Sequence, residues 1–339
     1  MSRLQGLAMR VRTSVMSRNY AVRKDTARRA VIVVAGPTAS GKSALALDLA
    51  EAFDGVVINA DSMQVYDALR ILTNRPNAAD EARAPHRLYG VMPAAETCSA
   101  ARWRSLAMAE IAAAHEARRL PIVTGGTGLY IRALIEGLAA IPDIPDALRK
   151  RARDLHASLG GPDFHELLAA ADPEMAARLA PGDSQRMIRA FEVIEATGRS
   201  LAEWQRLPLA GGALAQPAFT CLLMPPREPL YAACDARFTA MIEAGALSEA
   251  RALDALGLDP ASPVMKALGV PQLRRHITGE SSLAQAIAAA QQATRNYAKR
   301  QVTWFRNQMD GAVVYEQSYS NGIGQRAIEE TRRFLLTEQ

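Results

Sequence analysis

The sequence predicts an α/β fold in which a parallel sheet is flanked by helices and interrupted by a helical insertion. Two observations carry this prediction. Short apolar, β-branched runs alternate with segments of helical spacing, which is typical of parallel βαβ units. From about Asp143 onward the strand-like runs stop, and Ala, Leu, Arg and Glu recur at helical spacing. We therefore expect a core over 30–142 and 217–318, a helical insertion domain over 143–216 and a partly helical C-terminal tail over 319–339.

The first half of the core contains three predicted strands. Val31–Ala35 is an apolar, β-branched run that ends at Gly36-Pro37, and a helix over Ser43–Phe53 follows it. Val56–Ile58 is the second strand. An Ala-rich amphipathic helix over Trp103–Arg118 leads to the third strand, Pro121–Val123.

Proline and glycine mark both ends of the insertion. Pro142–Pro145 stands at its entry, and the loop Leu207–Pro217 stands at its exit. Phe219–Met224 is then predicted to be the fourth strand, and the chain is mostly helical over Leu230–Leu256 and Leu283–Phe305.

The composition is that of an ordinary globular chain, with 49% hydrophobic and 22% charged residues over a length of 339. It excludes the disordered and low-complexity classes. No apolar run approaches the ~18–20 residues that a membrane span needs, so we expect no membrane partner. The three cysteines, Cys98, Cys221 and Cys234, have no zinc-binding spacing and argue against a disulfide framework, which favours a cytoplasmic protein.

The net charge of +5 is concentrated at the N-terminus. Residues 1–30 hold seven Arg and one Lys against one Asp, whereas the rest of the chain has 32 basic and 34 acidic residues. We interpret 1–29 as a basic, disordered extension. The alternative is an organellar targeting segment, which is also rich in Arg and poor in acids.

The strongest motif lies between the first predicted strand and the first helix. Gly36-Pro37-Thr38-Ala39-Ser40-Gly41-Lys42-Ser43 fits the pattern G-x-x-x-x-G-K-[ST] in the context that the pattern requires. Backbone N–H groups of such a loop wrap phosphate oxygens, Lys42 supplies a charge, and Ser43 can ligate Mg²⁺ directly or through water. The motif predicts a P-loop NTPase-like core that binds a di- or triphosphate. It does not identify a nucleotide, and no guanine-reading Asn-Lys-x-Asp motif is present.

Two polar residues follow the second and third strands. In an open parallel sheet the ligand crevice lies outside the carboxyl ends of the strands, so Asp61 is expected beside the phosphate loop. Its carboxylate suits a general base, a metal orienter or a helix N-cap, and position alone does not decide among them. Thr127, in the turn Thr124–Gly128, offers a hydroxyl that can donate to a phosphate oxygen.

A second basic tract runs from Gln285 to Gln308 without an acid. Its cations fall among Tyr297, Trp304 and Phe305, a combination that suits a phosphate backbone with unstacked bases. A solvated helix face with the aromatic residues in the core explains the same spacing equally well.

Several segments together resemble the bacterial tRNA dimethylallyltransferases, also called tRNA isopentenyltransferases. The resemblance covers about residues 31–308, and its most specific parts are Asp61–Tyr66 and Lys299–Arg306. Segments that agree in the same order are Gly36–Ser43, Asp61–Tyr66, Pro85–Leu88, Gly125–Tyr130, Asp183–Val193, Thr197-Gly198, Pro226–Tyr231, Arg237-Phe238, Glu243–Gly245 and Arg295–Arg306.

The resemblance implies transfer of a dimethylallyl group from dimethylallyl diphosphate to N6 of the adenosine 3′ of the tRNA anticodon. It implies that the phosphate loop holds diphosphate with Mg²⁺, that Arg237 adds a donor, that Asp61 takes the N6 proton and that Thr127 steadies the leaving oxygen. By the same resemblance, contacts to the flipped adenosine and the anticodon stem-loop come from Asp61, Ser62, Met63, Gln64, Thr127, Arg149, Gln185, Arg186, Arg189, Lys299, Arg300, Gln301, Trp304 and Arg306.

The chain departs from the family pattern at two places. Leu72-Thr73-Asn74-Arg75-Pro76 stands where the family usually has Gly-Thr-Ala-Lys-Pro, and Gly269-Val270 stands where it has Gly-Tyr. These changes affect local backbone shape and one contact expected to face tRNA.

We expect a monomer. The competing interpretation is a P-loop kinase of a nucleoside or small metabolite, which would use the same loop with ATP.

Overall fold

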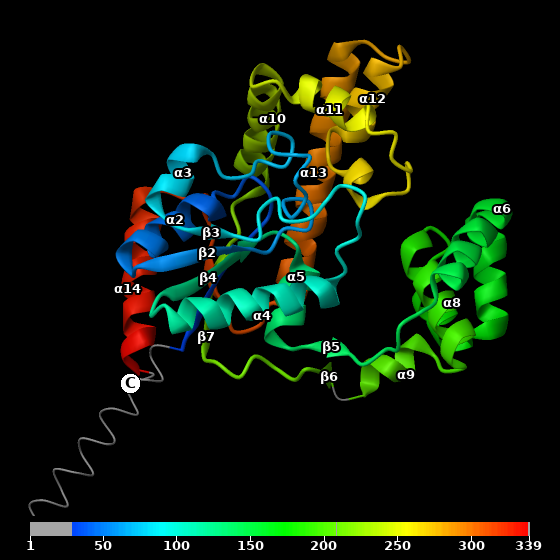
Figure 1. Ribbon diagram of the computed structural model, residues 1–339, viewed down its shortest axis with the longest axis horizontal. Coiled ribbons are helices and arrows are strands. Elements are labelled where there is room, and N and C mark those ends of the chain that lie inside the picture. Colours follow the sequence, from blue (N-terminus) through cyan, green and yellow to red (C-terminus); the bar gives the residue numbers. More distant parts are fainter. Residues whose placement is uncertain (1–28, 208, 338–339) are drawn as a thin grey trace, which may run out of the picture. The chain divides into compact units, whose positions relative to one another are not determined.

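The computed structural model of the chain describes residues 29–207 and 209–337. The expected basic extension at 1–29 lies outside these residues apart from Arg29. The chain divides into two compact units, and Figure 1 shows their elements. The first contains the described residues of Met1–Ile135 and Leu214–Gln339, and the second is Glu136–Ala213.

The first unit is built on a six-stranded sheet in the order β3-β2-β4-β1-β7-β8, and all its neighbouring pairs are parallel. Its strands are β1 Val31–Ala35, β2 Gly55–Asn59, β3 His86–Arg87, β4 Leu120–Gly125, β7 Ala218–Leu223 and β8 Val313–Tyr315. The predicted α/β class with a parallel sheet is therefore confirmed, and the four predicted strands lie at its centre.

Alternation along the central strand divides the core into two layers. Val31, Val33 and Ala35 of β1 face one hydrophobic cluster, and Ile32 and Val34 face the other. All five side chains are fully buried. Because both faces of the sheet are covered, the strand is a continuous apolar run rather than an alternating one.

Helices cover both faces (Figure 1). Two of them, α2 Lys42–Ala52 and α14 Asn321–Thr337, pack together on one face. The helices that contribute buried residues to the cluster on the other face are α4 Ala100–Glu116, α5 Gly128–Ile135, α10 Arg227–Glu243, α11 Ala246–Asp254, η1 Pro263–Lys266, α12 Val270–Ile277 and α13 Leu283–Gln308. A short helix, α3 Ala78–Arg83, lies between β2 and β3. Within the described part of the chain no helix is long and apolar enough to cross a bilayer.

Two segments differ from the simplest expectation. The helical stretch expected over Leu230–Leu256 breaks into α10 and α11 because Gly245 adopts a φ of +103°, which favours glycine over any other residue. The segment expected to be a partly helical tail is α14, whose Ala327 and Thr331 are fully buried.

The second unit is helical and has its own hydrophobic cluster. Its helices are α6 Asp146–Ala171, α7 Pro173–Arg178, α8 Ser184–Thr197 and α9 Leu201–Arg206, and the short strands β5 Leu138–Ala139 and β6 Leu209–Ala210 pair in antiparallel fashion. The helix α6 is interrupted at Gly160, where φ is +77°, and Pro162 lies two residues further on. Phe164 and Phe191 pack ring against ring at the centre of this unit.

Candidate active site

The carboxyl ends of β1, β2 and β4 bring the three predicted site loops together. These strands are neighbours in the sheet, so the phosphate loop, Asp61 and Thr127 emerge side by side. The Ser62 N–H donates to Thr127 Oγ1 over 2.9 Å, and the Thr127 N–H donates to the Ala60 carbonyl over 3.2 Å. These bonds join the loops after β2 and β4.

The phosphate loop has the backbone conformation that an anion cradle needs. Ala39 has a φ of +64° and Gly41 a φ of +89°, which turn the chain sharply into α2. No described side chain caps the N-terminus of α2. Its first N–H groups are therefore available to phosphate oxygens, and the helix dipole favours negative charge there.

Lys42 folds back over this loop. Its Nζ donates to the Pro37 carbonyl over 3.3 Å. Burial lowers the pKa of Lys42 to about 8; nearby Asp61 opposes this shift and Arg237 adds to it. A bound diphosphate would offset this electrostatic cost, because it would add negative charge beside the ammonium.

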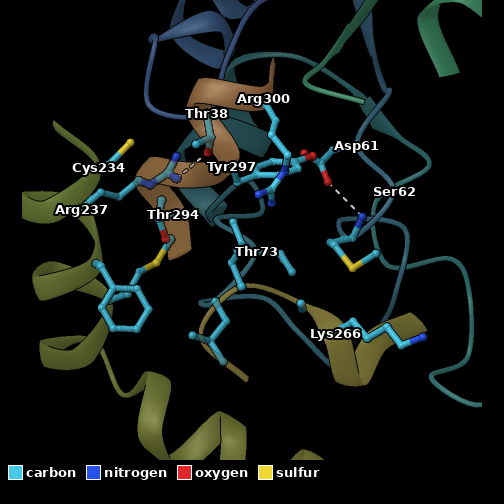
Figure 2. Close-up of a pocket in the computed structure, with 16 residues that line it drawn as sticks. Thr38, Asp61, Ser62, Thr73, Cys234, Arg237, Lys266, Thr294, Tyr297 and Arg300 are labelled. Atoms are coloured by element: carbon cyan, nitrogen blue, oxygen red, sulfur yellow. Dashed lines mark hydrogen bonds between the residues drawn. The ribbon is translucent and has the colours of Figure 1, made fainter. Parts of the chain in front are cut away.

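Arg237 reaches the same loop from α10. Its guanidinium donates to Thr38 Oγ1, as Figure 2 shows. Burial lowers the pKa of Arg237, and the Asp61 carboxylate opposes that shift. The two cations, Lys42 and Arg237, thus lie against Pro37 and Thr38 of the phosphate loop.

Asp61 forms a local turn and keeps one oxygen free. Its Oδ1 accepts from the Met63 N–H over 2.9 Å, whereas Oδ2 has no hydrogen-bond partner among the residues that the structure describes. No helix begins here, since the next one starts at Ala78. The helix-cap alternative is therefore wrong, and Asp61 is one of the residues that line the cavity described below.

The backbone of Asp61 is fixed by Asn59, which is fully buried. Asn59 Oδ1 accepts from the Asp61 N–H over 2.8 Å, and its Nδ2 donates to the carbonyls of Asp61 and Leu88, each over 3.0 Å. Trp103 Nε1 donates to the Asn59 carbonyl over 2.8 Å. This network holds the carboxylate without occupying Oδ2.

Tyr297 belongs to the site although sequence reasoning did not assign it there. Burial raises its pKa and the Asp61 charge raises it further, while a hydrogen bond with Thr127 lowers it. The phenol therefore stays protonated beside Asp61 and Thr127.

Thr38, Asp61, Arg237 and Tyr297 line a common cavity of about 260 Å³ (Figure 2), whereas Lys42 and Thr127 are not among its lining residues. Its lining combines polar side chains, such as Thr38, Asp61 and Arg237, with apolar ones, such as Phe238 and Met241. Its complete lining is Thr38, Asp61, Ser62, Met63, Leu72, Thr73, Cys234, Arg237, Phe238, Met241, Lys266, Ala267, Leu268, Thr294, Tyr297 and Arg300. The cavity therefore suits a ligand with one anionic and one apolar end.

The sequence predicted only part of what α10 contributes to the cavity lining. Cys234, Arg237, Phe238 and Met241 follow helical spacing and line the cavity together. Periodicity identifies such a face, but it does not say whether the face covers a core or a ligand. Only Arg237 was predicted.

The expected RNA contacts in the first unit fall into different environments. Lys299, Arg300 and Arg306 are exposed on α13, and the Arg300 guanidinium lies 5.7 Å from the Tyr297 ring centre. Trp304 is half-buried, and a Cβ added to Gly128 would lie 2.2 Å from its ring. The structure therefore has the arrangement of the second interpretation, with the cations solvated and the aromatic residues packed inward, and RNA binding by the exposed cations stays a prediction.

Gln301, one of the expected RNA contacts, lies in the interior of the protein. Only 6% of its surface is exposed, and both ends of its amide are bonded within the protein. Ser62, Met63 and Gln64 remain half-buried near Asp61. The Gln64 amide donates to the carbonyls of Thr73 and Asn74 over 2.8 and 2.9 Å.

The remaining expected RNA contacts lie in the second unit. Gln185 and Arg186 are exposed on the first turn of α8. Arg189 pairs with Glu192 over 3.2 Å, and Arg149 Nε donates to the Ile144 carbonyl over 3.0 Å.

The two departures from the family pattern have clear structural roles. Leu72 lines the cavity, and its Cδ2 would lie 2.9 Å from a Cβ added to Gly269. Arg75 donates to the carbonyls of Tyr66 and Asp67, each over 3.3 Å. Val270 is fully buried, so this position contributes to the core rather than to a surface that faces RNA.

Comparisons with known sequences agree over most of the chain. Residues 64–308 match the family model described as IPP transferase. The tRNA dimethylallyltransferase of Rhodospirillum centenum is 61% identical over 293 residues, which cover 86% of this chain and 92% of that one. That of Paramagnetospirillum magneticum is 55% identical over 306 residues, which cover 90% of this chain and 97% of that one.

Solved structures with the same fold also belong to tRNA prenyltransferases. The tRNA isopentenylpyrophosphate transferase of Bacillus halodurans matches with a TM-score of 0.67 and 29% identity, over 91% of this chain and 98% of that one. A eukaryotic dimethylallyltransferase described as acting on tRNA matches with a TM-score of 0.75 and 28% identity, over 91% of this chain and 80% of that one.

Proposed function

Because the chain belongs to the IPP transferase family, we propose that it transfers a dimethylallyl group from dimethylallyl diphosphate to N6 of the adenosine 3′ of a tRNA anticodon. The observation that carries this proposal is the cavity in which the Thr38–Arg237 pair, the free oxygen of Asp61 and an apolar wall meet. A prenyl diphosphate has the matching anionic and apolar ends.

The phosphate loop would bind the leaving group. As the allylic C1–O bond breaks, the electron pair stays with the diphosphate, and its negative charge grows. Lys42, Arg237 and the uncapped N–H groups of α2 would face that charge before the reaction begins, an arrangement that stabilises a transition state. Ser43 is exposed in the first turn of α2. Its hydroxyl would hold a Mg²⁺, which would neutralise part of the developing charge.

Asp61 would accept the proton. Adenine N6 is stacked inside RNA, so the base must leave the stack to reach the cavity. Its nitrogen then forms a bond to C1 of the prenyl group and loses a proton to Asp61 Oδ2. Oδ1 is committed to the Met63 N–H, which orients the carboxylate for this task. The Thr127 hydroxyl would donate to the oxygen that leaves.

The exposed cations of α13 support tRNA as the acceptor. Lys299, Arg300 and Arg306 lie on one helix, and Arg300 also lines the cavity. A kinase of a small metabolite has no use for this tract, and the relatives reported above favour the transferase.

The test is transfer of labelled dimethylallyl from its diphosphate to bulk tRNA by the full chain. We expect labelled N6-isopentenyladenosine after nuclease digestion. In parallel, dimethylallyl diphosphate should protect the protein from thermal unfolding more than ATP does. Protection by ATP alone, with no label in tRNA, would reject the transferase in favour of the kinase.

A further inference from the structure

Gln301 connects two loops of the site through a single buried amide. It lies on α13, and the Thr38 N–H donates to its Oε1 over 2.8 Å. Its Nε2 donates to the Gly126 carbonyl, also over 2.8 Å. The opposite amide orientation would set a donor against a donor and an acceptor against an acceptor, so these partners fix the orientation.

The second loop is shaped to admit this side chain. A Cβ added to Gly126 would lie 2.3 Å from Gln301 Nε2. Glycine at this position therefore lets the amide reach the backbone. Gln301 is 6% exposed, so water cannot replace either bond without opening the helix packing.

Each bonded loop carries a different part of the reaction. Thr38 belongs to the phosphate loop, and its hydroxyl accepts a hydrogen bond from Arg237. Gly126 precedes Thr127, whose Oγ1 accepts from the Ser62 N–H next to Asp61. The amide thus spans from the leaving-group end of the site to the proton-accepting end.

We propose that Gln301 is a positioning residue that sets the separation between the phosphate loop and the Gly125–Gly128 turn. It acts through Thr38 and Gly126 and needs no contact with substrate. The inference deepens the proposed function, on which it rests for the identity of the reacting groups. The two hydrogen bonds themselves are independent of that identity.

Two variants separate this role from its alternatives. Gln301→Met keeps similar bulk and loses both bonds. Gln301→Glu keeps the acceptor for Thr38, but when ionised it turns an acceptor toward the Gly126 carbonyl; protonation restores the donor. Gln285→Glu is the matched control on the same helix, because the Gln285 side chain only accepts, from the Ser282 N–H.

The experiment measures binding of inorganic diphosphate, binding of tRNA and single-turnover prenyl transfer between pH 6 and 8.5. For Gln301→Met we expect diphosphate binding and transfer to fall about tenfold or more at every pH, as for loss of buried hydrogen bonds, with tRNA affinity retained. Gln301→Glu should show the same loss at pH 8.5 and recover toward wild type as the pH falls. Gln285→Glu should follow wild type throughout.

Three results would overturn the proposal. Near-normal diphosphate binding by Gln301→Met would show that the bonds do not position the loop. Loss of tRNA affinity alone would make Gln301 an RNA contact, and a lower melting temperature without a change in binding or transfer would make it only structural. If Gln301→Met fails to fold, the pH dependence of Gln301→Glu relative to wild type decides. Absence of prenyl transfer by the wild type would instead reject the proposed function, while the diphosphate-binding arm would still test Gln301.

Discussion

Asp61 lines the cavity, and its Oδ1 accepts a hydrogen bond from the Met63 N–H over 2.9 Å, while Oδ2 of the same carboxylate has no hydrogen-bond partner among the described residues. One oxygen therefore maintains the turn and the other remains free for chemistry. Because an amide can replace the first function but not the second, the two can be separated by substitution.

For Asp61→Asn we expect a folded protein that binds tRNA and prenyl diphosphate nearly normally. Its side-chain oxygen can still accept from Met63, but the amide cannot take a proton from N6. Single-turnover transfer should be slower by at least about a hundredfold, within the range of general-base catalysis. Asp61→Ala, which also loses the hydrogen bond from the Met63 N–H, should in addition lose about 1 kcal/mol of stability. Near wild-type transfer by Asp61→Asn would mean that another group is the base.

Lys42→Ala should raise the KM for prenyl diphosphate and lower kcat. The ammonium lies against the phosphate loop, where negative charge grows as the leaving group departs. Lys299→Ala is the matched control, because it removes the same charge from the exposed face of α13. It should weaken tRNA binding and leave the KM for prenyl diphosphate unchanged. An equal loss of tRNA affinity in Lys42→Ala would contradict this division.

The salt dependence of tRNA binding should depend on Lys299, Arg300 and Arg306. Each exposed cation that neutralises a phosphate contributes about one unit or slightly less to the slope of log affinity against log salt. Single alanine variants should flatten the slope by that amount. Arg295→Ala is the control, because Arg295 is half-buried and paired with Asp235 over 2.5 Å. It should lower stability and leave the slope intact. Unchanged slopes for all three exposed residues would return the tract to a purely structural role.

Tyr319, which precedes α14, connects this part of the first unit to the phosphate loop. Its contribution to the free energy of unfolding should depend on pH. Its hydroxyl donates to Asp48 over 2.6 Å, a bond that raises the pKa of Tyr319 to about 12. Its N–H donates to the Ser40 carbonyl over 3.0 Å. Because the folded pKa exceeds that of a free phenol, near 10, the stabilisation is present below pH 10 and is lost as the pH rises through about 12.

Urea unfolding tests this prediction. Wild type should exceed Tyr319→Phe in stability by about 1 kcal/mol or less at pH 8, and the difference should shrink above pH 10. Tyr231→Phe removes a phenol from another part of the unit and serves as the control. A difference between wild type and Tyr319→Phe that does not change with pH would show that the Asp48 bond contributes nothing.

Much of the core followed from local sequence. Short local patterns predicted the run Val31–Ala35, the phosphate loop and the third strand. The structure has these elements close to the predicted bounds. The strands β3 and β8 were missed because they have two and three residues and form only where longer strands offer them an edge.

The site was less predictable, because its walls come from distant segments. Leu72, Phe238 and Lys266 meet around one cavity although no local pattern connects them. The same limit explains Gln301: its neighbours in the sequence are cations that face solvent, and its bonding partners lie 263 and 175 residues away. Family resemblance placed it with those neighbours, whereas tertiary contact assigns it to the interior.

The helix α13 imposes two unrelated kinds of selection on one stretch of sequence. Successive residues of a helix point about 100° apart, so Arg300 and Gln301 face solvent and interior respectively. A saturation scan across Leu283–Gln308 should therefore yield two interleaved tolerance profiles. Low salt should restore RNA binding to variants at the outward positions. Variants at the inward positions should not respond to salt. At outward positions that do not line the cavity, such as Lys299, an evolving lineage can thus change RNA binding without disturbing the groups on the inward face.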